Sequence, residues 1–168
     1  MLIINRSKYL QILFYEKEGH PMEKKDFLSL ISSGGNQLQS VIKCNEYTRQ
    51  FGVTLTEVEA RQLLDARKQS LHENGRVEFG EGILSKLIFT FCDSPFIYQD
   101  NYVDTMEALQ DIFYLYKNES LDVLSDDELI EYMKNEFDGT CQGSLEYLED
   151  TSLERFARQI RRSGHGFF

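Results

Sequence analysis

Tryptophan is absent from this chain of 168 residues, and proline occurs only twice, at Pro21 and Pro95. Because proline lacks a backbone N–H and breaks helix interiors, this scarcity leaves long segments free to form helices. Basic residues are also few: 18 lysines and arginines stand against 28 aspartates and glutamates, so the net charge is −10. Proteins that bind the phosphate backbone usually carry a basic surface, so this balance argues against nucleic acid as a partner.

Cysteines and long apolar runs are scarce as well. The three cysteines stand at positions 44, 92 and 141 and form no Cys-x-x-Cys pair, which is typical of a protein in a reducing compartment. The apolar stretch Tyr9–Tyr15 is too short to cross a membrane, and no small-residue cleavage site follows it. We therefore expect a cytoplasmic protein that does not associate with membranes.

The first 21 residues differ from the rest of the chain, because they contain no helix cap and no amphipathic repeat. In a bacterial gene, the codons of residues 17–19 (Lys-Glu-Gly) can spell a purine-rich ribosome-binding sequence a few bases upstream of the codon for Met22. This arrangement predicts that translation begins at Met22. Residues 1–21 would then be a mis-called extension, and residues 22–168 would form one domain.

Amphipathic helix patterns dominate the remainder of the sequence. Two capping boxes, in which a Thr or Ser is followed three residues later by Glu, begin at Thr56 and Ser125. The longest pattern runs from Asn101 to Asn118, with apolar residues spaced by three or four so that they share one helix face. Those residues are Tyr102, Met106, Leu109, Phe113 and Tyr116. No long strand pattern is present, and only Val77–Phe79 has a short extended character. The sequence therefore predicts an all-α, single compact domain of about six helices.

Three short stretches are distinctive: GRVEFG at 75–80, FCDSPFI at 91–97 and FDGTCQGSLE at 137–146. Through them, the segment from about Thr54 to Arg161 resembles a bacterial family of small, acidic, helical proteins known only as a domain of unknown function. The resemblance implies a small soluble bacterial protein. It assigns no activity and transfers no catalytic residue.

The stretch FDGTCQGSLEYLE, residues 137–149, has the outline of a twelve-residue EF-hand calcium loop, with Gly143 at the sixth position. The candidate calcium ligands are Asp138, Thr140, Gln142, Glu146 and Glu149. Positions three and five carry Thr and Gln where calcium needs carboxylates, and no second loop follows. We therefore predict a helix–turn–helix junction that binds no calcium at physiological concentrations, and a degenerate calcium loop is the weaker alternative.

Acidic residues are concentrated in residues 92–150, where sixteen aspartates and glutamates stand against two lysines. No convergent catalytic set and no cofactor motif accompany them. The favoured hypothesis is thus a non-enzymatic interaction or accessory module that presents an acidic face to a protein partner, which charge complementarity would make basic. The aromatic and acidic loop before the longest helix suggests an interaction surface made of Tyr98, Asp100, Tyr102 and Asp104.

Two further functions stay open at this point. The first is an enzyme whose acid–base carboxylates are brought together by the fold, and its candidates are Asp93, Asp100, Asp104 and Glu107. The second is contact with nucleic acid through Arg155, Arg158 and Arg162, which share one face of the last helix. The sequence leaves the oligomeric state open.

Overall fold

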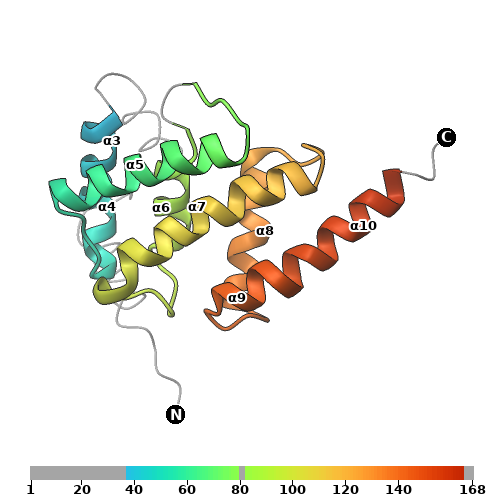
Figure 1. Ribbon diagram of the computed structural model, residues 1–168. Coiled ribbons are helices and arrows are strands. Elements are labelled where there is room, and N and C mark those ends of the chain that lie inside the picture. Colours follow the sequence, from blue (N-terminus) through green and yellow to red (C-terminus); the bar gives the residue numbers. More distant parts are fainter. Residues whose placement is uncertain (1–36, 80–81, 165–168) are drawn as a thin grey trace, which may run out of the picture.

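The computed structural model describes residues 37–79 and 82–164, and in these ranges the chain is helical with short connections and no strand (Figure 1). The helices are α3 (Gln37–Lys43), α4 (Asn45–Thr48), α5 (Glu57–Glu73), α6 (Leu84–Phe91), α7 (Tyr102–Glu119), α8 (Asp126–Asp138), α9 (Leu145–Tyr147) and α10 (Glu154–Gly164). The 3₁₀ turns η1 (Arg49–Phe51) and η2 (Gln99–Asn101) precede α5 and α7, and a π-helical segment, η3 (Leu148–Leu153), joins α9 to α10. The prediction of an all-α, single compact domain is confirmed. The predictions about residues 1–21 and Met22 lie outside the described residues.

Both predicted capping boxes form. The Thr56 backbone N–H donates to Glu59 Oε2 at 2.7 Å, and Thr56 Oγ1 accepts from the Glu59 N–H at 3.2 Å. Ser125 and Glu128 repeat the exchange at 2.8 and 3.2 Å. Each box satisfies backbone donors that the first turn of a helix leaves without partners, and so fixes where α5 and α8 begin.

Helix α7 occupies the centre of the fold. It packs against α5 on one side and against α9 and α10 on the other, so that these helices run side by side in Figure 1, while α6 and α8 pack behind it. The predicted apolar face of α7 is buried, and α6 contributes Leu84, Leu87, Ile88 and Phe91 to the same core. Burial of this face leaves the opposite, acidic face of α7 at the surface. Within residues 37–79 and 82–164, no helix has both the length and the apolar character required to cross a bilayer.

Two of the three distinctive stretches pack against each other. Ser94 Oγ donates to Asp138 Oδ1 at 2.5 Å, and Phe96 packs edge-on against Phe137 with ring centres 6.2 Å apart. Gly143, at φ +82°, lies so close to Phe96 that an added Cβ would come within 2.5 Å of that side chain. The junction predicted as a helix–turn–helix connection has this form, since α8 ends at Asp138 and α9 begins seven residues later.

Candidate functional site

An open groove of about 610 Å³ runs between α5 and α7 on the exposed side of this helix pair. Its lining from α5 is Val58, Arg61, Gln62, Asp65, Ala66, Gln69 and Glu73, and its lining from α7 is Glu107 and Asp111. Four carboxylates and one guanidinium therefore give the lining a net formal charge of −3. We refer to Asp65, Glu73, Glu107 and Asp111 as the groove carboxylates.

The helical repeat places these carboxylates in the groove. Asp65 and Glu73 are two turns apart on α5, and Glu107 and Asp111 are one turn apart on α7, so each pair follows one face of its helix. The opposite faces are held in the core by residues such as Leu63, which is fully buried. Packing of the apolar faces thus turns the two acidic rows toward the same hollow.

The hydrogen bonds in the groove leave its negative charge uncompensated. Gln62 Nε2 donates to Glu107 Oε1 at 2.9 Å and links the two walls, but an amide carries no charge. The one guanidinium, Arg61, forms an ion pair with Glu57 at 2.8 Å. In the part of the chain that the structure describes, none of the groove carboxylates forms an ion pair.

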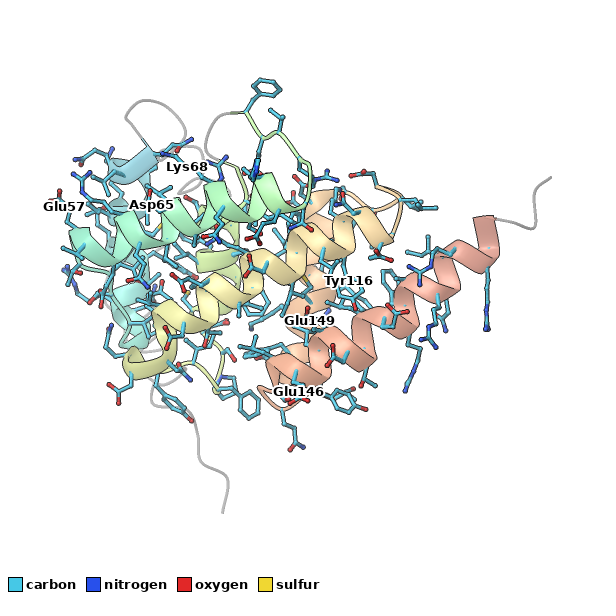
Figure 2. All side chains as sticks on the ribbon, in the orientation of Figure 1. Glu57, Asp65, Lys68, Tyr116, Glu146 and Glu149 are labelled. Carbon is cyan, nitrogen blue, oxygen red and sulfur yellow. The ribbon has the colours of Figure 1, made fainter. Side chains whose placement is uncertain are left out.

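The negative charge continues across α7 to η3. Burial, together with the nearby carboxylates Asp150 and Asp111, raises the pKa of Glu149 above its ordinary value. The Tyr116 hydroxyl donates to the backbone carbonyl of Glu149, and Figure 2 shows these two residues next to each other between α7 and η3. Burial, and then the carboxylates led by Glu154, raise the pKa of Tyr116 to about 12, so this hydroxyl stays protonated as a donor. The acidic face therefore extends from the groove to η3.

The buried side of the same helix pair carries an ion pair. Arg67, 3% exposed, lies on α5, and its Nε donates to Glu78 Oε1 at 2.8 Å. The other carboxylate oxygen of Glu78 accepts from the Tyr114 hydroxyl of α7 at 2.7 Å. The backbone N–H of Ile83 completes the set at 3.2 Å from Glu78 Oε1. This cluster joins α5, α7 and the loop between α5 and α6, so we assign it a role in holding the fold.

The candidate calcium ligands are distributed over the α8–α9 junction. Asp138 forms an ion pair with Lys134 at 2.5 Å and accepts the hydrogen bond from Ser94, so both of its oxygens are engaged. Thr140 and Gln142 are exposed in the turn. Glu146 is exposed on α9, and Glu149 lies beyond it on η3. Among the residues that the structure describes, no group of three or more His, Cys, Asp or Glu side chains is arranged to hold a metal ion. The absence of calcium binding stays a prediction.

The four carboxylates considered for acid–base chemistry lie beside different helices. Asp93 forms an ion pair with Lys134 of α8 at 2.8 Å, whereas Glu107 is hydrogen-bonded by Gln62 of α5. Asp100 is exposed in η2, and Asp104 is exposed on the first turn of α7. Of these four, Glu107 alone lines the groove.

The predicted interaction surface at the start of α7 is wrong at Tyr102. Tyr98 is 63% exposed, and Asp100 and Asp104 are exposed as expected, but Tyr102 is 0% exposed. Tyr102 is the first residue of α7 and stands one turn before Met106, on the face that enters the core. The apolar spacing of α7 already contained this information, because the same spacing places Tyr102 among the buried residues.

Sequence reasoning missed three of the groove carboxylates, Asp65, Glu73 and Asp111. Their signal was present as acidic residues at helical spacing opposite the leucines of α5 and the apolar face of α7. The pairing of α5 with α7 is a tertiary contact, and no local pattern in the sequence specifies it. The groove exists only because α5 and α7 pack side by side, so it could not be predicted from either helix alone.

Comparison of the chain with curated proteins and with solved structures found no match. Comparison with protein families found one that covers residues 40–166, and its description is a family of unknown function, DUF6323. The matched range includes all three distinctive stretches and all nine lining residues of the groove. Since this range is most of the chain, the protein belongs to DUF6323, a family of unknown function.

Proposed function

We propose that the protein is a non-enzymatic, cytoplasmic interaction module, and that its groove between α5 and α7 binds a basic segment of a protein partner. The observation that carries this proposal is the set of groove carboxylates, none of which forms an ion pair with a lysine or arginine among the described residues. Carboxylates that face one another across a hollow repel, so a cation placed between them lowers the electrostatic energy of the complex.

Arginine suits this groove better than a small cation. Its guanidinium forms paired hydrogen bonds with carboxylates, and its apolar stem packs on apolar surface. The groove offers such surface at Val58, which is 74% exposed, and at Ala66. A partner helix with arginines one turn apart would meet carboxylates one turn apart on α7, at Glu107 and Asp111.

Fluorescence anisotropy with a labelled peptide tests the proposal. The peptide is a synthetic helix with arginines at positions i, i+3 and i+7, and the full chain is titrated into it at low salt. We expect binding to the wild type and at least a tenfold weaker affinity in the variant Asp65→Asn/Glu107→Gln/Asp111→Asn. Added salt should weaken binding to the wild type, because exposed charges are screened.

A matched control removes three negative charges elsewhere on the surface. The variant Asp100→Asn/Glu131→Gln/Glu136→Gln has the same net charge as the groove variant but leaves the groove intact. It should retain the affinity of the wild type. Equal weakening in both triple variants would show that the peptide senses only overall charge, and would refute a binding site in the groove.

A further inference from the structure

Helix α10 extends from the body of the molecule with little of its surface covered. It has eleven residues, of which only Ala157 is buried, and Figure 1 shows its C-terminal end projecting past the other helices. It is attached to the body at two points: Phe156 stacks on Tyr132 of α8 with ring centres 4.3 Å apart, and Arg161 forms an ion pair with Glu119 of α7 at 2.5 Å. The outer face of α10, which carries Arg155, Arg158 and Arg162, makes neither of these contacts and is exposed.

The outer face of α10 is basic. Arg155, Arg158 and Arg162 are exposed and follow one another at i, i+3 and i+7, which places them on one side of the helix. Arg158 forms an ion pair with Glu154 of its own helix at 2.8 Å. Within the described ranges, Arg155 and Arg162 form no ion pair. Among the described residues, the groove carboxylates and two of the three arginines on the outer face of α10 thus form no ion pair.

The two surfaces match in length as well as in sign. The arginines span seven residues of helix, or about 10 Å, and the groove carboxylates of α5 span eight residues, or about 12 Å. We propose, on the basis of the groove function above, that the partner segment is α10 of a second copy of this chain. Its arginine face would lie along the groove with the guanidiniums against the groove carboxylates.

The contact must form between copies. Within one chain, α10 packs beside α7 on the side away from α5, so its arginine face does not reach its own groove (Figure 1). The groove and the helix are different surfaces, and each copy has one of each. Such a heterologous contact joins copies head to tail, into rows or closed rings.

Sedimentation velocity of the full chain tests this contact. At a protein concentration of about 100 µM and about 20 mM salt, we expect the wild type to self-associate, and at about 500 mM salt to dissociate toward the monomer. Two variants each remove one surface: Asp65→Asn/Glu107→Gln neutralises the groove, and Arg155→Gln/Arg162→Gln neutralises the helix. Each variant alone should sediment as a monomer at low salt.

Mixing the two variants gives the decisive result. The groove variant keeps a normal α10, and the helix variant keeps a normal groove, so an equimolar mixture should form a dimer and grow no further. A wild type that stays monomeric at low salt, or a mixture that stays monomeric, would overturn the head-to-tail contact. If the synthetic arginine peptide still binds the groove in that case, the groove function stands and only the identity of its partner is wrong.

Discussion

The helix pair α5–α7 carries charged groups on two sides and uses them differently. On its buried side, Arg67 meets Glu78 at 2.7 Å, and Tyr114 donates to the same carboxylate. On its exposed side, the groove carboxylates form no ion pair with any lysine or arginine of the described residues. A charge removed from water must be paired, whereas a charge in water is solvated and screened. The buried charges are therefore committed to the fold, and the exposed ones are available to a partner.

The buried Arg67 determines which residue of the loop between α5 and α6 turns inward. Val77 and Phe79 are 79% and 90% exposed, while Glu78 between them turns inward to Arg67. This is the reverse of ordinary burial, in which apolar residues leave water. Leaving a guanidinium unpaired in the core costs more than exposing two apolar side chains, so the loop delivers its carboxylate to Arg67.

Glu78→Gln should have the largest effect on stability, because it removes a charge from the buried side of the helix pair. It keeps the size of the side chain but removes the counter-charge of a buried arginine, and we expect the free energy of unfolding to fall by about 3 kcal/mol. The control is Glu57→Gln, whose ion pair with Arg61 has side chains 62% and 61% exposed and should cost less than about 1 kcal/mol. Urea denaturation measures both. Equal losses in the two variants would contradict the distinction between the buried and the exposed side.

The sequence predicted the helices better than it predicted this cluster. Capping boxes and helical spacing are local, so α5, α7 and α8 began where the patterns placed them. Arg67 lies at a core position among leucines, a place where an unpaired charge is not tolerated, but nothing in the sequence identifies Glu78 as its partner across eleven residues. The groove was equally hard to predict from the sequence, because it depends on which helices pack together. Local sequence patterns therefore predicted the helices, whereas the groove and the Arg67–Glu78 cluster depend on tertiary contacts.

Gly82→Ala gives the next largest effect. Gly82 has φ +64°, and an added Cβ would stand 1.5 Å from Glu78 Oε1, so alanine must push the carboxylate away from Arg67. Gly75 is a matched control with φ +63° and no atom within 4 Å of an added Cβ. Both variants bear the cost of a left-handed alanine. We expect Gly82→Ala to cost about 2 kcal/mol more than Gly75→Ala in thermal or urea unfolding, since it also disturbs a buried ion pair.

Lys134 provides an intermediate case, because its side chain is 16% exposed and pairs with both Asp93 and Asp138. Burial lowers the pKa of Lys134, but hydrogen bonds to Asp138 and Asp93 outweigh it and raise the pKa overall. The stabilisation is therefore complete at neutral pH and is lost as the pH rises through the raised folded-state pKa of Lys134.

We expect Lys134→Met to lower the free energy of unfolding by about 1–2 kcal/mol at neutral pH, between the effects of breaking a buried and an exposed ion pair. Lys86→Met is the control, since Lys86 and its partner Asp127 have side chains 38% and 76% exposed. Urea denaturation compares the two variants at neutral and alkaline pH. The difference between wild type and Lys134→Met should shrink at alkaline pH, and a difference independent of pH would contradict this account.

The smallest expected effect on stability is at Glu149, at the edge of the exposed acidic face. Its removal should raise the stability of the protein, whereas the substitutions above lower it. Burial, Asp150 and Asp111 raise the pKa of Glu149, so the folded protein favours its neutral form. A group with a raised pKa contributes stability below its ordinary pKa, and this contribution is lost as the pH rises through the raised value. At neutral pH the ionised Glu149 therefore opposes folding. Solvent screening limits this cost to a few tenths of a kcal/mol.

Glu149→Gln should thus stabilise the protein slightly at neutral pH, and the gain should vanish in acid, where Glu149 is already protonated. Glu146→Gln removes an equal charge from the exposed neighbouring helix α9 and serves as the control. In the background of Asp111→Asn, the gain from Glu149→Gln should shrink, because one source of repulsion is gone. Thermal unfolding across a pH series measures all three. A stabilisation that is independent of both pH and Asp111 would mean that the groove and η3 do not form one acidic face, and that charge on the exposed side acts only locally.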